Sequence, residues 1–270
     1  MSRAAASGSR ARLVMLAALN SCCLALLLLP LHVGAETPLP PGFAYLRDVE
    51  PAIAQDMRYA SQNNFVGRPL PGYDAAECVL RRDAAAALKQ VQADLAVAGL
   101  ALKAYDCYRP ARAVRAMAQW ANDGRRDNPT KRFYPTLHKE DLFALGYIAA
   151  RSQHSTGTAI DLTLIEAAAP PAPAFDPAAT YGACTGPAAE RAPDNSIDMG
   201  TGYDCFDTKS HTASGSISAE QRRLRNHLVA AMAKRGFSNY HREWWHYEFR
   251  SAAPKGYFDI PIRPRGAPAG

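Results

Sequence analysis

Apolar residues recur every three or four positions between residues 80 and 98, which is the spacing of one face of an α-helix. Gly99 follows directly and is a common helix stop, so the pattern predicts a helix over 80–98. Pro110 predicts that a second helix runs over 111–121, because the fixed φ angle of proline suits the first turn of a helix.

A third helix is bracketed by its end signals. Ser218 is a good N-cap and Gly236 is a good stop, so a helix is expected over 219–235. A short fourth helix is expected over 141–150. Shorter apolar runs precede, separate and follow these helices.

Four of these shorter runs have strand character. Strands are interspersed with helices, without a regular β-α-β rhythm and without a glycine-rich phosphate loop. This order predicts an α+β fold, a single domain with a small, mainly antiparallel sheet flanked by helices. The expected strands are residues 52–58, 100–105, 159–165 and 240–249.

Two further segments have the composition of irregular structure. Residues 63–72 are rich in Asn, Gly and Pro and predict a loop, which would suit either surface packing or one wall of a pocket. Residues 166–197 are rich in Pro, Ala and Gly and predict an irregular insertion that contains its own cysteine.

Residues 1–35 have the features of a secretory signal peptide. Three arginines without acids precede a mostly apolar run, and Val33-Gly34-Ala35 is a small-residue cleavage pattern. We therefore expect cleavage after Ala35, a mature domain over 36–270, and a periplasmic or secreted protein without stable membrane association. The alternative is an uncleaved membrane anchor, which Pro30 and the small residues disfavour.

The charge of the chain changes with this cleavage. Loss of the three arginines lowers the formal net charge from +6 to about +3. The mature chain has no run of lysines and arginines with interleaved aromatic residues, so its basic charge does not indicate binding to nucleic acid.

Four cysteines remain in the mature chain, and an even number in an exported protein suggests disulfides. Three pairings are possible, and we prefer Cys78–Cys107 with Cys184–Cys205 because each joins neighbours across a short segment. The competing interpretation is a cysteine zinc site, but no C-x-x-C spacing supports it.

The stretch from Ser152 to Asp161 carries the strongest chemical signal, reading S-x-H-x-x-G-x-A-x-D. Asp161 lies inside an apolar run, and a buried carboxylate needs a cation, a set of donors or a metal. His154 close by makes zinc the leading candidate, since imidazole and carboxylate are both good Zn²⁺ ligands. A second motif near the C-terminus, Glu243-Trp-Trp-His246, offers a third ligand, His246.

The remaining groups suit a hydrolytic zinc site. A zinc-activated water needs a general base, and Glu243 lies three residues before the third ligand. Arg109 lies at a strand-to-helix junction, where it would stabilise an oxyanion or form a salt bridge to Asp106. A lone histidine is more often a structural core residue, but the two motifs together in one chain favour zinc.

These segments resemble the VanX-type zinc D-alanyl-D-alanine dipeptidases, relatives of zinc D,D-carboxypeptidases. The resemblance implies His154, Asp161 and His246 as ligands of one Zn²⁺, Glu243 as catalytic base and Arg109 as transition-state stabiliser. It also implies substrate-binding roles for Asp204, which would hold the free ammonium of a dipeptide, and for Ser152. The matching segments are residues 59–67, 106–110, 152–164, 199–207 and 243–247.

The implied function is hydrolysis of D-Ala-D-Ala to D-alanine outside the cytoplasm, in cell-wall peptide turnover. The insertion over 166–197 looks longer than the usual connection in the family, so the resemblance does not predict the rim of the pocket. A D,D- or L,D-carboxypeptidase that trims peptidoglycan stems is the alternative, and Asp204 disfavours it because an acylated substrate has no ammonium. A zinc-stabilised binding module is a third possibility, which the presence of Glu243 disfavours.

Overall fold

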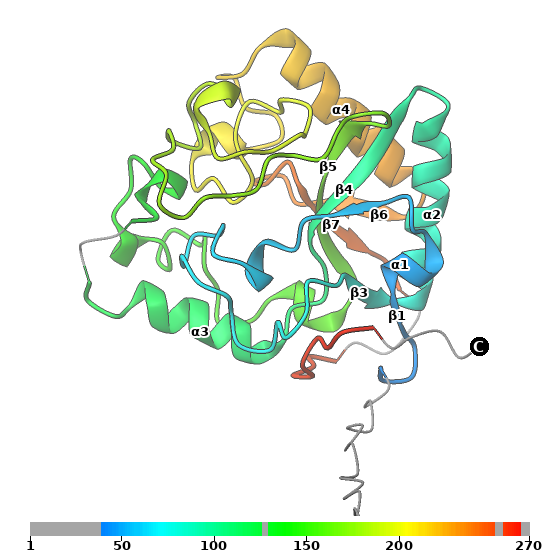
Figure 1. The fold of residues 1–270 in the computed structure, drawn as a ribbon, viewed down its shortest axis with the longest axis horizontal. Coiled ribbons are helices and arrows are strands. Elements are labelled where there is room, and N and C mark those ends of the chain that lie inside the picture. The colour runs from blue at the N-terminus through cyan, green and yellow to red at the C-terminus, as the bar shows by residue number, and fades with distance from the viewer. Residues whose placement is uncertain (1–38, 126–128, 252–255, 266–270) are drawn as a thin grey trace, which may run out of the picture. The chain divides into compact units, whose positions relative to one another are not determined.

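A five-stranded sheet in the order β2-β4-β5-β7-β6 forms the centre of the fold in the computed structural model (Figure 1). Strand β2 (Ala54–Gln55) is parallel to β4 (Leu100–Asp106), and every other neighbouring pair is antiparallel. The remaining strands are β5 (Ala159–Glu166), β7 (His246–Phe249) and β6 (Phe237–Asn239). The prediction of an α+β fold with a mainly antiparallel sheet is confirmed.

The structure describes residues 39–125, 129–251 and 256–265. The predicted signal peptide over 1–35 lies outside these residues. Within them, no helix is both long enough and apolar enough to cross a membrane.

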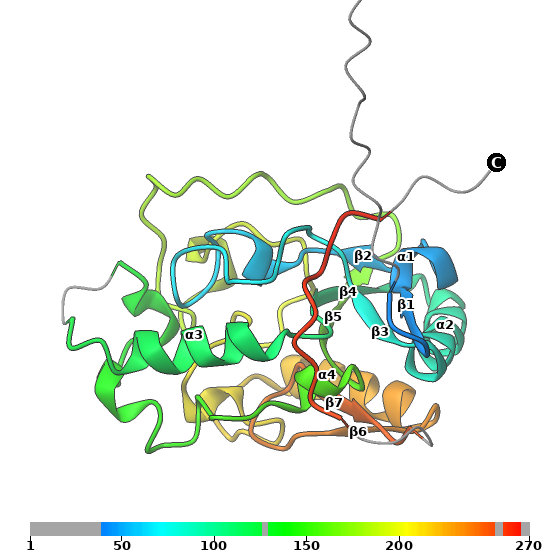
Figure 2. The ribbon, with the colours of Figure 1, turned by 90° about the horizontal axis from the view of Figure 1, so that it is seen from below.

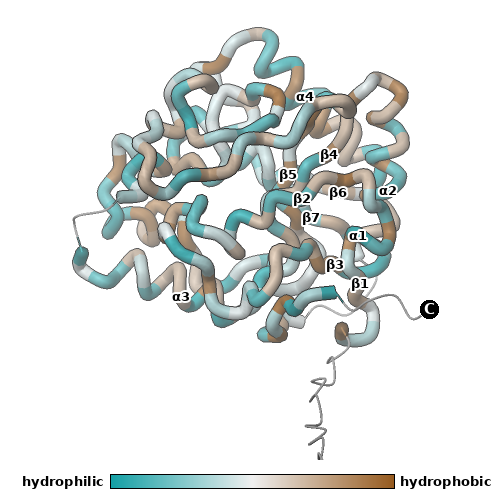
Figure 3. The backbone as a smooth tube through the Cα atoms, in the orientation of Figure 1, coloured by the Kyte–Doolittle hydropathy of each residue, from teal (hydrophilic) through white to brown (hydrophobic). Residues whose placement is uncertain are grey.

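Two long helices pack beside the sheet (Figures 1 and 2). Helices α2 (Arg82–Ala96) and α4 (Ala219–Ala233) contact each other, and they also contact β4 and β6 respectively. Leu88 of α2 and Leu228 of α4 are fully buried and join the inner strands in one hydrophobic core. Along both helices polar and apolar residues are interleaved, as expected where only one face is buried (Figure 3).

A second, aromatic core surrounds helix α3 (Ala111–Ala121). Trp120 of this helix packs edge-on against Phe65 and Tyr134, with ring centroids 5.3 and 5.9 Å apart. Phe65 belongs to the predicted loop over 63–72, so this loop packs inward and one of its rings reaches the second core.

Local end signals placed two helices well. Helix α3 has the predicted bounds, and Pro110 is its N-cap. Ser218 caps α4 through a capping box with Gln221, and the helix ends at Ala233, three residues before Gly236 adopts a positive φ angle.

The start of α2 differs from the prediction. Leu80 belongs to β3 (Val79–Arg81), a short strand that pairs with β1 (Phe43–Tyr45), and α2 begins only at Arg82. Leu80 is apolar because it is buried in this strand, and by chance its position also fits the helical spacing of the residues that follow. A four-residue helix, α1 (Leu46–Val49), follows β1 directly.

Three other predictions are wrong: one expected helix is absent, and two expected strands are shorter than predicted. The expected helix over 141–150 is a series of turns after a short 3₁₀ turn at Lys139–Asp141, and Gly146 has a φ angle of +80°. The range 240–249, expected to be one strand, contains the connection between β6 and β7 followed by β7, which begins only at His246. The expected strand over 52–58 shortens to β2.

The insertion over 166–197 is irregular, as predicted. After β5 ends at Glu166, its one regular turn is the short 3₁₀ turn at Ala188–Glu190. Both predicted disulfides are present, Cys78–Cys107 and Cys184–Cys205. The second attaches this segment to the residue that follows Asp204.

Candidate active site

Three neighbouring strands place three polar residues in a row across the sheet. The β4–β5 pairing sets Asp106 opposite Asp161, after a shift of register beyond Ala104, and the β5–β7 pairing sets Asp161 opposite His246. Side chains directly opposite on neighbouring strands lie close enough to interact. Asp161 is therefore held in the middle strand with a polar neighbour on each side.

His154 reaches the same point from the turn before β5. This 3₁₀ turn, Gln153–Thr156, is capped by Ser152, whose Oγ accepts the backbone N–H of His154 at 3.3 Å. Gly157 ends the turn with a φ angle of +78°, and a Cβ atom there would lie 2.4 Å from the Phe43 ring. The glycine of the motif is therefore required both by backbone conformation and by space.

His154, Asp161 and His246 direct one ligand atom each at a common point. Asp161 Oδ1 lies 2.9 Å from His246 Nδ1 and 3.3 Å from His154 Nε2, and the two ring nitrogens are 3.1 Å apart. Tetrahedral ligands at about 2.0–2.1 Å from Zn²⁺ lie about 3.3 Å from one another. The spacing of the three atoms, which form a candidate metal site, is close to that of a zinc site.

The outer nitrogens of both rings face acceptors. His154 Nδ1 lies 2.7 Å from the carbonyl oxygen of Cys107, and His246 Nε2 lies 3.6 Å from Glu248 Oε1. Protons on these outer nitrogens leave lone pairs on the inner ones, which face the Asp161 carboxylate. Three acceptors that converge in this way fit a divalent cation.

Glu243 lies beside this point, in the connection between β6 and β7. Its Oε2 is 4.0 Å from His246 Nδ1, and its side chain is 22% exposed. Burial raises the pKa of Glu243, and Asp161 adds to the effect. A carboxylate with a raised pKa, next to a metal site without being one of the ligands, can act as a general base.

Arg109 is partly buried and fixed by Asp106, so the expected salt bridge to Asp106 is present. Its Nε and Nη2 each donate to Asp106 Oδ2 at 2.9 Å, and Nη2 is 3.7 Å from Asp161 Oδ2. The guanidinium carbon lies 4.8 Å from the centre of the Tyr59 ring. Within the described residues, the one hydrogen-bond acceptor of Nη1 is the weak thioether sulfur of Met117, at 3.6 Å. Nη1 can therefore donate to a substrate oxygen.

Asp204 is the one residue other than glycine with a positive φ angle, +55°, in the described ranges. Its side chain accepts a hydrogen bond of 2.7 Å from Tyr59, and the residue is 5% exposed. Burial and the nearby Asp161 raise the pKa of Asp204 well above its usual range. In the described part of the chain no lysine or arginine forms a salt bridge with it. A cation brought by a ligand would lower that pKa again.

All seven residues singled out in the sequence line one cavity of about 250 Å³. Asp161 and His246 come from strands β5 and β7, His154 from the turn that Ser152 caps, and Glu243 from the connection between β6 and β7. Aromatic and apolar side chains form other parts of the wall, including Phe65 and Tyr147. The structure thus brings together side chains that are as far apart in the sequence as Arg109 and His246.

Several residues that shape this site were not predicted. Tyr203 donates a hydrogen bond of 2.9 Å to Asp161 Oδ2, and Tyr59 contacts both Arg109 and Asp204. Glu248 and the Cys107 carbonyl orient the two histidines. Glu248 lies two residues after His246, on the same side of its strand, and this alternation is a signal that the sequence does contain.

Comparison with known proteins identifies the family of this chain. The model of the D-ala-D-ala dipeptidase family matches residues 41–172 and 173–262. A D-alanyl-D-alanine dipeptidase of Enterococcus faecium is 32% identical over 223 residues, which cover 82% of this chain and 98% of the relative.

Two further relatives carry the same name. The D-alanyl-D-alanine dipeptidase of Streptomyces coelicolor is 34% identical over 221 residues, covering 82% of this chain and 98% of the relative. That of Escherichia coli is 30% identical over 203 residues, covering 75% of this chain and 82% of the relative.

Proposed function

This chain belongs to the D-ala-D-ala dipeptidase family, and from that premise we propose that it hydrolyses the dipeptide D-alanyl-D-alanine to D-alanine. The catalytic centre would be one Zn²⁺ held by His154, Asp161 and His246. The observation that carries the proposal is that Asp204, a buried carboxylate that forms no salt bridge with a lysine or arginine of the described residues, lines the same cavity as the candidate metal site.

This arrangement would bind the ammonium end of a dipeptide and place its peptide bond at the metal site. A free ammonium on the substrate matches Asp204, whose pKa is raised by burial and by the nearby charge of Asp161. The peptide bond, two bonds further along, would then lie towards Glu243 and Arg109. Bound zinc would supply a Lewis acid that polarises the peptide carbonyl and activates water.

The proton and charge transfers can be assigned to this chain's own residues. Glu243 accepts the proton of the attacking water and delivers it to the leaving amine, a role that its raised pKa supports. Arg109, fixed by Asp106, directs Nη1 at the oxygen that becomes negative in the tetrahedral intermediate. Ser152 lies at the edge of the cavity and is proposed to contact the substrate.

The alternative function, removal of the last residue from peptidoglycan stems, fits Asp204 less well. A stem peptide is acylated at the position where the dipeptide has its ammonium. Its binding would leave the Asp204 carboxylate buried without a cation, which is costly. We therefore propose that the substrate is the free dipeptide.

We also propose that the protein acts outside the cytoplasm, after removal of residues 1–35. The two disulfides between the mature cysteines support this location, because such bonds persist in oxidising compartments. Mass spectrometry of the exported protein should find an N-terminus at Glu36 and no free thiols at these four cysteines.

The activity is tested by adding D-Ala-D-Ala to the purified mature protein and measuring released D-alanine. The zinc-loaded protein should release D-alanine, lose this activity after a chelator and regain it with Zn²⁺. His154→Ala should bind no zinc at this site and show no activity. A zinc-loaded wild-type protein that releases no D-alanine would contradict the proposal.

A further inference from the structure

The carboxylate of Asp161 is held at both oxygens. Oδ1 faces the two histidine nitrogens of the candidate metal site. Oδ2 accepts the hydroxyl of Tyr203 at 2.9 Å, while the guanidinium of Arg109 is further away, at 3.7 Å. A carboxylate bound in this way has one oxygen for the metal and one for the phenol.

The Tyr203 ring is fixed by aromatic neighbours on two sides. It stacks on Tyr105, with centroids 4.6 Å apart and planes inclined by 19°, and it meets the ring of Trp245 edge-on at 5.6 Å. The residue is 4% exposed. The hydroxyl therefore has little freedom to turn away from Asp161.

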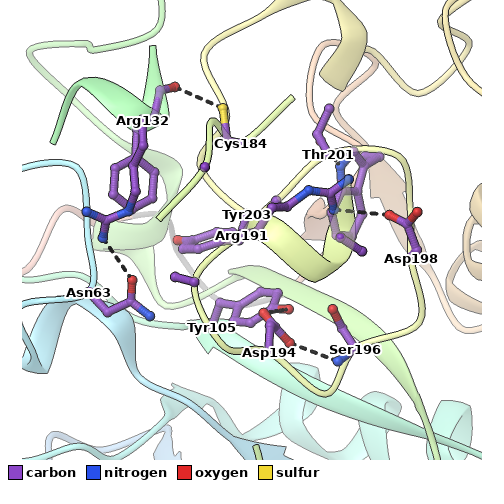
Figure 4. A pocket seen from close by; sticks show the side chains of 16 residues that line it. Asn63, Tyr105, Arg132, Cys184, Arg191, Asp194, Ser196, Asp198, Thr201 and Tyr203 are labelled. Carbon is purple, nitrogen blue, oxygen red and sulfur yellow. Dashed lines mark hydrogen bonds and ion pairs between the residues drawn. The ribbon is translucent and has the colours of Figure 1, made fainter. Parts of the chain in front are cut away.

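Behind this ring lies a separate small cavity of about 60 Å³ (Figure 4). Tyr203 and Tyr105 both line it. The Tyr105 hydroxyl donates a hydrogen bond of 2.7 Å to Oδ2 of Asp194, a residue of the insertion. The two tyrosines thus share a stack but direct their hydroxyls at different carboxylates. Only the hydroxyl of Tyr203 reaches the metal site.

We infer that Tyr203 is a positioning residue for the metal centre: its hydroxyl holds Asp161 so that Oδ1 alone is presented to the metal. This inference rests on the metal site proposed above. Hydrogen bonds to the outer atoms of metal ligands fix their orientation, and loss of one typically weakens metal binding about 10–100-fold. A phenol is protonated at neutral pH, so it donates to the carboxylate under working conditions.

The test compares Tyr203→Phe with Tyr105→Phe. Each variant keeps its ring and the stack, and each loses one buried hydroxyl that bonds a carboxylate. Zinc dissociation constants are measured by competition with a chromophoric chelator, without substrate. Tyr203→Phe should bind zinc about 10–100-fold more weakly than the wild type, whereas Tyr105→Phe should bind it as the wild type does.

Near-ultraviolet circular dichroism of the zinc-free proteins shows whether each variant keeps its packed core. Wild-type zinc affinity in Tyr203→Phe would overturn the inference, and so would an equal loss in both variants, since that would reflect the stack rather than the hydroxyl. A wild-type protein that binds no zinc would instead contradict the metal site itself. The two failures are therefore distinguishable.

Discussion

The buried carboxylates of Asp161 and Asp204 and the partly buried carboxylate of Glu243 line one cavity, and their surroundings give them different proton affinities. For Asp161, burial opposes ionisation, but His154 and His246 hold its pKa well below its usual range. For Glu243 and Asp204, burial raises the pKa, and the charge of Asp161 adds to it. Such differences suit a metal ligand, a base and a cation-binding group respectively.

Glu243→Gln tests the base. The amide cannot take a proton, so activity on D-Ala-D-Ala should fall by the roughly 10²–10⁴-fold typical of general acid–base catalysis. Because Glu243 is not among the three proposed ligands, zinc content by elemental analysis should stay at one per chain. Survival of the activity would mean that another group transfers the proton.

Arg109→Lys tests the fixed guanidinium. Lysine keeps the charge but lacks the fork that donates from Nε and Nη2 to Asp106. Loss of one oxyanion donor typically lowers kcat about 10²–10³-fold, so kcat should fall by this order with zinc content unchanged. A change confined to KM would assign Arg109 to ground-state binding.

Elements with local end signals could be predicted from the sequence, whereas elements that depend on distant partners could not. Helix α3 follows from Pro110, and it has the predicted bounds. Strand β3 is set by its pairing with β1, about 36 residues earlier, which no local pattern reports. The same division holds in the site, where the motif identified His154 but the Tyr203 contact is tertiary.

The turn that carries His154 gives a prediction at the level of the element. Gly157→Ala should destabilise the protein by about 1–2 kcal/mol for the left-handed backbone and by about 1–3 kcal/mol more for overpacking against Phe43. The matched control is Gly99→Ala, which has a φ angle of +70° but no atom within 4 Å of the added Cβ.

Urea unfolding of both variants provides the measurement. Gly99→Ala should show the backbone cost alone, and Gly157→Ala should show the larger loss. Equal losses would mean that the Phe43 ring moves aside without cost and that space does not require this glycine.

At the scale of the whole molecule, the insertion is anchored at two places. Its first part runs along the outside of the fold beyond β2 (Figure 2), and Cys184–Cys205 ties its later part to the neighbour of Asp204. Asp194 forms salt bridges with Arg58 and with Lys103, whose side chains are 5% exposed. The insertion is therefore attached to β4 through Lys103, and to the turn at Arg58–Ala60 through Arg58, by ion pairs in which both cations are buried.

These ion pairs predict a pH dependence of stability. Burial opposes ionisation of Asp194, but Arg58 and Lys103 hold its pKa well below its usual range. A carboxyl group with a lowered folded-state pKa contributes stability that is fully present above its unfolded pKa of about 3.9 and is lost as the pH falls towards the folded value.

Asp194→Asn isolates this contribution, because all other carboxylates are common to both proteins. The difference in unfolding free energy between the wild type and Asp194→Asn should be constant above about pH 5 and should shrink below about pH 4. A difference that stays the same from pH 7 to pH 3 would show that the charge of Asp194 contributes nothing.

We propose that this cavity selects a free dipeptide because Asp204 binds its ammonium. The direct measurement is kcat/KM on D-Ala-D-Ala and on N-acetyl-D-Ala-D-Ala, for the wild type and for Asp204→Asn. A hydrogen bond to a charged group contributes about 1.5–3 kcal/mol, which corresponds to roughly ten- to two-hundred-fold in kcat/KM.

The wild type should prefer the free dipeptide, and Asp204→Asn should lose roughly ten- to two-hundred-fold on it with little change on the acetylated peptide. A wild-type preference for the acetylated peptide would contradict the account and favour a carboxypeptidase. An equal fall on both substrates would show that Asp204 only stabilises its turn.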